Sequence, residues 1–302
     1  SDFGNTINSK LATRYQLSKQ LVLRGVVSTG FRAPTPGQSN YTGIRTNTDF
    51  SSNLIVQDGT VLPTSELALS LGGKALDAEK SKNLSLGFNS NLSDKFNLSV
   101  DFYWIELKDR IAKTIDIPVV DNPFFSRASF YTNALDSDTK GLDIVANYVK
   151  NWQNGTSSQM KLAFNHNQTD ISSQNQVNGI NPVSDETIFN IENSLPKNRL
   201  NFTVIHNFSN NWKIQARANY FGKTTDERVE HEKVASTTYI DVEVYYQQTE
   251  KIQWTLGASN LFDAYPSEIE TLKANCLLYA QRSSLIYDGG MAYLRLNYNF
   301  GL

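Results

Sequence analysis

Stretches of about ten residues in which apolar and polar side chains alternate recur along the whole chain, and they constrain its fold more than any other feature. Between Trp212 and Phe221, for example, apolar residues occupy the even positions, and Lys, Gln, Arg and Asn occupy the odd positions between them. A period of two is typical of β-strands whose two faces meet different surroundings. Eleven strands are expected, near residues 5–16, 19–29, 80–90, 95–109, 138–149, 158–168, 196–208, 211–221, 237–247, 251–260 and 288–300.

The connections between these strands alternate strictly between short and long. Residues 17–18 and 91–94 make short connections, whereas 30–79 and 110–137 make long ones, and the alternation continues to the last strand. Bacterial outer-membrane barrels combine short periplasmic turns with longer extracellular loops, and a tilted strand needs about 9–11 residues to cross the hydrocarbon layer. The pattern therefore favours an all-β, antiparallel transmembrane β-barrel. A soluble antiparallel sandwich also alternates apolar and polar residues and remains the alternative fold.

The directions of the strands predict that the chain is part of a larger barrel. The last strand follows a long loop and would end in the periplasm, whereas the first strand leads into a short turn and would begin outside the cell. Single-chain bacterial barrels have an even number of strands. An odd number of strands is therefore expected upstream, and residues 1–302 are expected to contain no separate second domain.

Composition argues against nucleic-acid binding, catalysis and a metal centre. The net charge is −2 and no Lys/Arg cluster occurs, whereas phosphate recognition needs a basic surface. His166 and His206 lie on expected strands with no Ser nucleophile or second base placed by the sequence, so no enzyme activity and no cofactor are expected. The run Glu230-His231-Glu232 is interpreted as a solvated loop rather than a metal site.

Five blocks of sequence resemble, in the same order, blocks of the TonB-dependent receptors of Gram-negative outer membranes. They are GVVSTGFRAPTPGQ (25–38), LDAEKSKNLSLG (76–87), FYWIELKDRI (102–111), NALDSDTKGLDIVANY (133–148) and GASNLFDAYP (257–266). The resemblance implies a 22-stranded barrel filled by an N-terminal plug, with these eleven strands as its second half. The plug, and the segment that binds TonB, would then lie upstream of residue 1.

The same resemblance implies energised uptake of a scarce nutrient, such as a ferric siderophore, cobalamin, haem or an oligosaccharide. The expected partners are this ligand, the TonB–ExbB–ExbD complex through the upstream region, and the lipid bilayer with its lipopolysaccharide. Three other functions remain as alternatives. They are an autotransporter translocator, an outer-membrane enzyme such as a lipase, and a soluble carbohydrate-binding protein.

Candidate functional residues lie in the long loops and at the end of the second expected strand. Exposed aromatic side chains bind sugars and heterocycles with little loss of entropy, although they can equally pack loop against loop. The expected ligand contacts are Tyr41, Phe50, Phe124, Phe125 and Tyr131.

The run from Gly30 to Gly37 ends the second expected strand, because its two prolines stop strand pairing. Arg32 in this run is expected to point inward, toward a carboxylate of the plug or into the ligand vestibule, although it can equally be part of a packed loop root. A further set of aromatic residues is expected at the membrane interfaces: Trp104, Trp212, Trp254, Tyr298 and Phe300.

Overall fold

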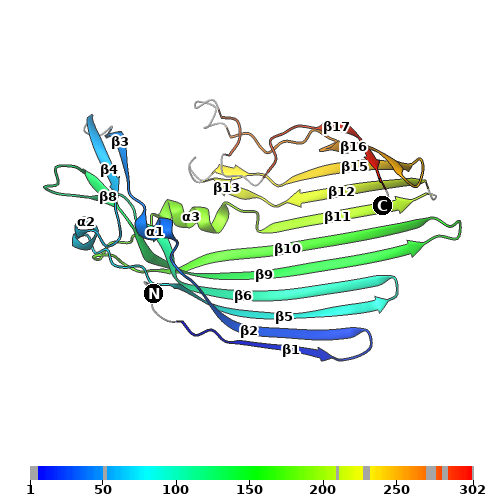
Figure 1. Cartoon of the computed structure of the whole chain (residues 1–302), viewed down its shortest axis with the longest axis horizontal. Coiled ribbons are helices and arrows are strands. Elements are labelled where there is room, and N and C mark those ends of the chain that lie inside the picture. Colours follow the sequence, from blue (N-terminus) through cyan, green and yellow to red (C-terminus); the bar gives the residue numbers. More distant parts are fainter. Residues whose placement is uncertain are drawn as a thin grey trace.

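Eleven antiparallel strands form one continuous sheet that dominates the chain (Figure 1). The computed structural model describes residues 6–49, 53–208, 211–226, 232–269, 277–280 and 285–300. The strands pair in the order β1-β2-β5-β6-β9-β10-β11-β12-β15-β16-β17. Their bounds are Lys10–Gln16, Leu21–Arg32, Glu79–Ser93, Phe96–Lys113, Tyr131–Asn151, Ser157–Gln174, Asn198–Asn207, Trp212–Phe221, Thr237–Gln247, Ile252–Ser259 and Met291–Tyr298.

The sheet is open at both edges. In the described part of the chain β1 pairs only with β2, and β17 pairs only with β16. Each neighbouring pair of sequential strands is antiparallel, and no strand of this sheet is out of sequence order. This is the arrangement of a barrel wall that has not closed, in agreement with the expected number of strands.

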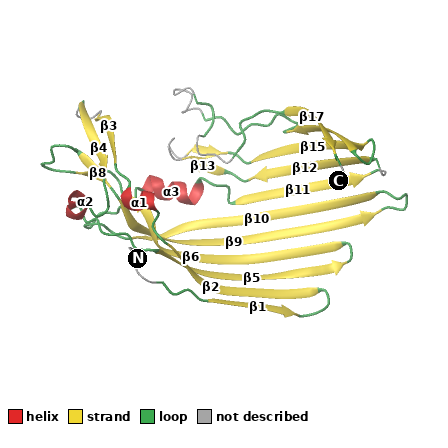
Figure 2. Ribbon diagram, viewed as in Figure 1, coloured by secondary structure: helices red, strands yellow, loops and turns green. Residues whose placement is uncertain are grey.

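Short and long connections lie at opposite ends of the sheet (Figure 2). We call these ends the turn end and the loop end. The helices and a smaller, four-stranded sheet lie at the loop end, whereas the hairpin turns lie at the other end, near the C-terminus. The alternation of connection lengths expected from the sequence is therefore confirmed.

The two faces of the sheet differ as the alternation predicts. On one face, Phe102 of β6 lies opposite Leu142 of β9, and on the other face their neighbours Asp101 and Asp143 lie opposite each other. We call these the apolar face and the polar face. Side chains of the apolar face remain exposed, for example Leu256 at 60%. A sandwich would bury such side chains under a second sheet, so the soluble sandwich does not fit this structure.

The long segment 30–79 was expected to contain no strand, and this expectation was wrong. It contains β3 (Gly43–Asp49) and β4 (Leu54–Thr60), together with the short helices α1 (Pro36–Asn40) and α2 (Glu66–Ser70). Strand β4 pairs in parallel with β8 (Arg127–Ser129), a partner from another loop that local sequence patterns cannot reveal. The remaining elements are β7 (Ile117–Pro118), α3 (Asp185–Asn193), β13 (Thr224–Asp226) and β14 (Glu232–Val234).

The buried apolar side chains gather at the loop end rather than beneath the sheet. One cluster joins three long connections through Ala68, Phe130 and Val177, with Ile117 beside them. A second contains Ala134, Leu135 and Val183, against which Ile188 of α3 packs. The loops therefore have hydrophobic cores of their own, which hold them in a defined position above the sheet.

Candidate functional site

Three of the family-like sequence blocks meet at a buried carboxylate where the sheet passes into the loops. Glu79 begins β5, and its side chain is 3% exposed. One carboxylate oxygen accepts a hydrogen bond from the Arg32 guanidinium of β2 at 2.6 Å and another from the backbone N–H of Ile111 in β6 at 2.8 Å. A buried carboxylate needs such donors to offset the loss of water, so Glu79 ties together the ends of three strands.

Asn133 makes a second junction in the same region. Its side-chain oxygen accepts from the backbone N–H of Asp77 at 2.9 Å, and its amide donates to the carbonyls of Asp77 and Asp109 at 2.9 and 2.7 Å. Asp109 has a φ of 58°, and the register between β6 and β9 shifts beside it, between Leu107 and Arg110. Asn133, the first residue of the block 133–148, therefore holds the blocks 76–87 and 102–111 at the points where they leave the sheet.

At the loop end, the four-stranded sheet β3-β4-β8-β7 folds around another buried carboxylate. We call this sheet the cap. Asp58 of β4 has a side chain only 4% exposed. It accepts from Arg127 of β8 at 2.7 and 2.9 Å, from Asn47 of β3 at 2.6 Å and from Arg45 of β3 at 3.3 Å. A second, more exposed carboxylate, Asp116, accepts from the same Arg45 at 2.9 Å.

The balance of burial and ion pairing sets the charge of Asp58. Burial alone would raise the pKa of this carboxyl, but the hydrogen bonds from Arg127, Asn47 and Arg45 outweigh it and hold the pKa below its ordinary value. Asp58 is therefore charged at neutral pH and binds two loops that are far apart in sequence.

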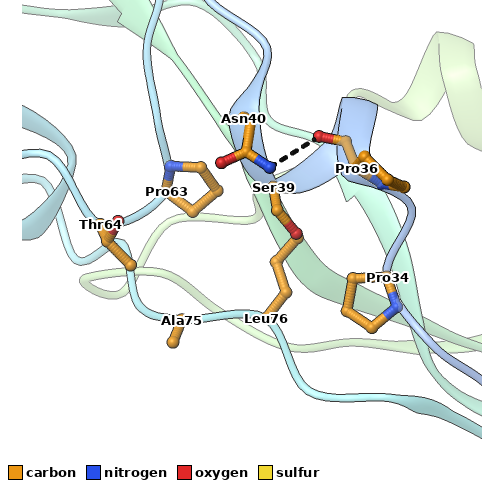
Figure 3. Close-up of a pocket in the computed structure, with 8 residues that line it drawn as sticks. All are labelled: Pro34, Pro36, Ser39, Asn40, Pro63, Thr64, Ala75 and Leu76. Carbon is orange, nitrogen blue, oxygen red and sulfur yellow. Dashed lines mark hydrogen bonds between the residues drawn. The ribbon is translucent and has the colours of Figure 1, made fainter. Parts of the chain in front are cut away.

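A pocket of about 420 Å³ opens among the loops beside α1 (Figure 3). Its lining combines three proline rings with a few neutral polar groups and no charged side chain: Pro34, Pro36, Ser39, Asn40, Pro63, Thr64, Ala75 and Leu76. Thr35 starts α1 with a capping box in which it and Gln38 bond each other's backbone, and the Asn40 amide donates to the Pro36 carbonyl at 3.1 Å. The wall of the pocket is thus locally braced, and its chemistry suits a neutral polar ligand.

Three tyrosines stack in the connection between β16 and β17. The rings of Tyr265 and Tyr279 lie 6.2 Å apart at an angle of 7°, and those of Tyr279 and Tyr287 lie 5.6 Å apart at 22°. Asp263 raises the pKa of Tyr265 through a hydrogen bond, so that phenol remains protonated. We call this set the tyrosine stack. The sequence analysis missed it, because three tyrosines separated by loop residues show no period.

The structure does not gather the aromatic residues chosen from the sequence into one cluster. Tyr41 and Phe124 are exposed, at 54% and 69%. Phe125 lies over Gly59 inside the cap, and Tyr131 pairs with Lys113 at the start of β9. Phe50 lies outside the described residues, as do Glu230 and His231. Ligand contact by these aromatic side chains stays a prediction.

Arg32 lies on the polar face, where it lines a cavity of about 500 Å³ near the loop end. Its neighbour two positions away on that face is Gly30, and Phe31 between them belongs to the apolar face, opposite Lys80. Within the described chain its carboxylate partner is Glu79. Contact with a plug stays a prediction.

The rest of the polar face carries a ladder of hydrogen-bonded side chains. Arg24 pairs with Asp101, and the Asn165 amide donates to Asp143 at 2.6 Å. Further along the sheet, Glu243 accepts from the hydroxyls of Tyr245 and Tyr293 at 2.5 and 2.6 Å. A surface so rich in paired polar groups suits contact with water or a hydrated protein.

The aromatic residues expected at membrane interfaces lie at the two ends of the apolar face. At the turn end the ring of Trp212 lies 4.5 Å from that of Tyr246, whose cross-strand partner is Trp254. Tyr298 and Phe300 lie 4.7 Å apart at the same end. Trp104 lies toward the loop end, where its indole donates to Asp138 at 2.8 Å. Their role as interfacial girdles stays a prediction.

The described residues include no group of three or more metal-ligating side chains suited to a metal ion. None of the helices in that part of the chain is both long and apolar enough to cross a membrane.

Comparison with protein-family models decides the family. The model "TonB dependent receptor-like, beta-barrel" matches residues 1–261. The chain belongs to the TonB-dependent receptor family. Receptors of this family are transporters rather than enzymes and form β-barrels of the outer membrane, so the autotransporter and lipase alternatives no longer apply. A comparison with curated protein sequences gives no significant match.

Solved structures of similar fold include two siderophore receptors and an iron transporter. A variant of the ferric enterobactin receptor PfeA of Pseudomonas aeruginosa is 14% identical to this TonB-dependent receptor chain, with a TM-score of 0.65. The match covers 97% of this chain and 40% of PfeA. The siderophore receptor PirA of Acinetobacter baumannii is 16% identical with a TM-score of 0.66 and coverages of 99% and 42%. The FrpB iron transporter of Neisseria meningitidis is 14% identical with a TM-score of 0.61, and the match covers 96% of this chain and 39% of FrpB. Identities this low show a shared fold, and the chain spans about two fifths of each relative's length.

Proposed function

We propose that this chain forms the C-terminal half of the barrel of an outer-membrane receptor, which takes up an iron siderophore or a similar scarce nutrient with energy from the TonB–ExbB–ExbD complex. The observation that carries the proposal is the pairing of an exposed apolar face with a hydrogen-bonded polar face on the same strands. Only a wall between lipid and a hydrated interior satisfies both faces at once. The solved relatives named above, which are siderophore and iron receptors, support this ligand class.

The folded loops supply the ligand-binding part of the proposal. The tyrosine stack presents two outer rings, Tyr265 and Tyr287, that are 42% and 41% exposed. Rigid aromatic rings give contact area at a small cost in conformational entropy. Tyr41 and Phe124 supply separate exposed rings on other loops. These side chains would make the first contacts with a ligand before it enters the barrel.

We place the plug against the polar face, with Arg32 as one of its contacts. The guanidinium has five donors, and one of its nitrogens donates a hydrogen bond to Glu79. The side chain is 59% exposed toward the cavity that it lines. A carboxylate of the plug could therefore approach Arg32 without breaking its existing ion pair.

Ligand binding and uptake by the complete receptor test the proposal. The purified receptor would be titrated with ferric siderophores of the catecholate, hydroxamate and carboxylate classes, and with cobalamin and haem, by tryptophan fluorescence. Uptake of the radiolabelled ligand would be compared in cells with and without TonB. Uptake of one of these ligands that disappears without TonB is expected. A receptor that binds none of these ligands, or whose uptake does not need TonB, would refute the proposal.

The variant Tyr279→Ala tests the ligand surface, because it removes the central ring of the tyrosine stack. The variant removes two ring contacts, with Tyr265 and Tyr287, each worth about 1 kcal/mol beyond buried area. The two outer rings then lose their fixed positions, and affinity for the ligand is expected to fall about fivefold or more. Tyr279→Phe is the matched control, since it keeps the ring and removes only the hydroxyl. Equal affinities of the two variants and the parent would remove the stack from the binding surface.

A further inference from the structure

The chain contains two Asn-Gly dipeptides, and they lie at opposite ends of the sheet. Asn154-Gly155 lies in the turn between β9 and β10, at the turn end, and Asn178-Gly179 lies in the connection between β10 and β11, at the loop end. In an Asn-Gly sequence the backbone nitrogen of glycine can attack the carboxamide carbon of asparagine, because glycine has no side chain to hinder the approach. The reaction needs both groups to be free to meet, so the local structure decides which dipeptide reacts.

Three hydrogen bonds hold Asn154 and Gly155 away from this reaction. The side-chain oxygen of Asn154 accepts from the backbone N–H of Thr156 at 3.2 Å and from the Thr156 hydroxyl at 2.7 Å. The Gly155 N–H, whose nitrogen would attack, donates to the carbonyl of Trp152 at 3.2 Å. The turn also closes a hairpin of long strands, since β9 has 21 residues and β10 has 18. Such a turn opens rarely.

Asn178 and Gly179 have none of these restraints. Among the residues that the structure describes, neither the Asn178 carboxamide nor the Gly179 N–H has a hydrogen-bond partner, and both residues are exposed. Their φ values of 48° and 76° are positive, as in the type I′ turn of a two-residue hairpin. In the described chain one isolated bridge holds this turn, through two hydrogen bonds of 2.9 Å between Val177 and Ile180. Opening of this bridge lets the backbone of Asn178 rotate, so that the nitrogen of Gly179 reaches the carboxamide.

We infer that Asn178 is a site of spontaneous deamidation in the folded receptor. A base in the solvent removes the proton of the Gly179 N–H, and the nitrogen forms a bond to the carboxamide carbon of Asn178. The bond from that carbon to Nδ2 then breaks, and ammonia leaves after taking a proton from the solvent. Water opens the resulting succinimide ring at either of its two carbonyls, which leaves aspartate or isoaspartate at position 178. Water is the only co-reactant, and no oxidation or reduction takes place.

The product alters the contact between this turn and α2. A Cβ at Gly72, just after α2, would lie 2.8 Å from the carboxamide carbon of Asn178, so this side chain lies against the C-terminal end of the helix. The backbone N–H groups of Gly72 and Gly73 donate to carbonyls of α2 at that end. A negative charge near a helix C-terminus is unfavourable, and isoaspartate adds a methylene to the backbone beside the buried Val177. Conversion is therefore expected to loosen the end of α2.

Ageing of the complete receptor tests the inference. The purified receptor would be incubated at mildly alkaline pH, both folded and unfolded in guanidinium, and conversion at positions 154 and 178 would be followed by mass spectrometry of peptides. In the folded receptor, position 178 is expected to convert at least about tenfold faster than position 154, because three hydrogen bonds oppose ring closure at Asn154. In the unfolded receptor the two positions are expected to convert at similar rates, because both are Asn-Gly dipeptides.

Two variants serve as matched controls. Asn178→Gln keeps a carboxamide but needs a larger ring that closes more slowly, so it is expected to abolish conversion at position 178 and to leave position 154 unchanged. Thr156→Val removes the hydroxyl that donates to Asn154, and it is expected to speed conversion at position 154 about fivefold. Labelling with an isoaspartyl methyltransferase distinguishes isoaspartate from aspartate in each sample.

Equal rates at the two positions in the folded receptor, or faster conversion at position 154, would overturn the inference. Conversion at position 178 that occurs only after unfolding would do the same. Hydrogen–deuterium exchange tests the effect on α2. The amides of Gly72 and Gly73 should exchange faster in the aged receptor than in the fresh one, and ageing should not change them in Asn178→Gln. Unchanged exchange in the aged parent would contradict the loosening of α2.

Discussion

Replacing the buried carboxylate of the cap is expected to loosen the cap without loosening the barrel wall. The substitution Asp58→Asn keeps the size of the side chain and removes its charge. It leaves the guanidinium groups of Arg127 and Arg45 facing a neutral amide in a site where the native carboxylate is 4% exposed. The ion pairs that hold β3, β4 and β8 together would then be lost.

The expected loss follows from burial. Breaking a fully buried ion pair by removing one partner costs about 3–5 kcal/mol, whereas an exposed pair contributes about 0–1 kcal/mol. Asp58 is buried, but the side chains of Arg127 and Arg45 are 38% and 61% exposed, and Arg45 keeps its ion pair with Asp116, so the loss of Asp58 is partly compensated by water and by this second carboxylate. We therefore expect a loss of about 2–3 kcal/mol, which lowers the equilibrium constant for cap closure roughly 30- to 150-fold.

Hydrogen–deuterium exchange of the complete receptor measures this change directly. Exchange of the amides in 43–49, 54–60 and 127–129 should accelerate by the factor given above, because their exchange follows local opening. Amides in the middle of β9 and β10 should exchange at the parental rate. Asp116→Asn is the matched control, since it removes the other carboxylate that contacts Arg45, one that is 25% exposed.

The control is expected to change cap exchange by less than fivefold, in keeping with an exposed ion pair. If Asp58→Asn leaves cap exchange unchanged, or if Asp116→Asn has an equal effect, then burial does not decide the strength of these pairs and the reasoning fails. Acceleration across β9 and β10 as well would show that the cap and the wall open as one unit.

Three other substitutions or conditions give separate expectations. The pKa of Asp58 is lowered in the folded state, so its contribution to cap stability is present above the unfolded pKa of about 4 and is lost as pH falls through the folded pKa. The cap amides should therefore lose protection from exchange below about pH 4, which pH-jump exchange would detect. The substitution Asp58→Asn should abolish this pH dependence. Glu79→Gln should cost about 2 kcal/mol at the junction, seen as faster exchange of the Ile111 amide, while unchanged exchange there would mean that the neutral amide serves equally well. Gly141→Val should lower the urea midpoint of the barrel, because a Cβ at Gly141 would lie 2.1 Å from the Tyr103 ring; an unchanged midpoint would show that the ring moves aside freely.

The wall of the barrel was predictable because its signal is local. Alternation within each strand depends only on the two faces that the strand presents, and so the residues from 212 to 221 predicted a strand that the structure reproduces as β12 (Trp212–Phe221). The ends were less accurate. Strand β9 begins at Tyr131 rather than near 138, because its first residues pair with β6 beyond a register shift that follows Leu107. Pairing beyond a register shift cannot be recognised from the alternation of apolar and polar residues.

The structure gives physical reasons for residues of the family-like blocks. Asn260 and Asp263 adopt positive φ values of 47° and 53°, and Asn260 exchanges hydrogen bonds with Ala264 at 2.8 and 2.9 Å. The NLFD run is therefore a tight turn that ends β16. Gly141 leaves room for the ring of Tyr103, and the hydroxyl of Tyr103 accepts a hydrogen bond from the Asn167 amide at 2.6 Å.

The folded loops could not be predicted in the same way. Asp58 and Arg127 are 69 positions apart, and the tyrosine stack depends on the path of a long connection. Neither contact has a local sequence signal, since both arise from tertiary packing that overrides propensity. The role of single side chains selected by type, such as Phe125, therefore stays a prediction.

The parallel pairing of β4 with β8 has a consequence for the order in which the receptor folds. Strands β5 and β6 lie between them in the chain, so β4 can meet β8 cheaply only after the hairpin of β5 and β6 has brought its own ends together. Closing a loop of this length before that hairpin exists would carry an entropy cost that no local contact offsets. Folding of the cap should therefore lag behind formation of the hairpin of β5 and β6, and a protease-resistant cap indicates a molecule in which these strands have already paired.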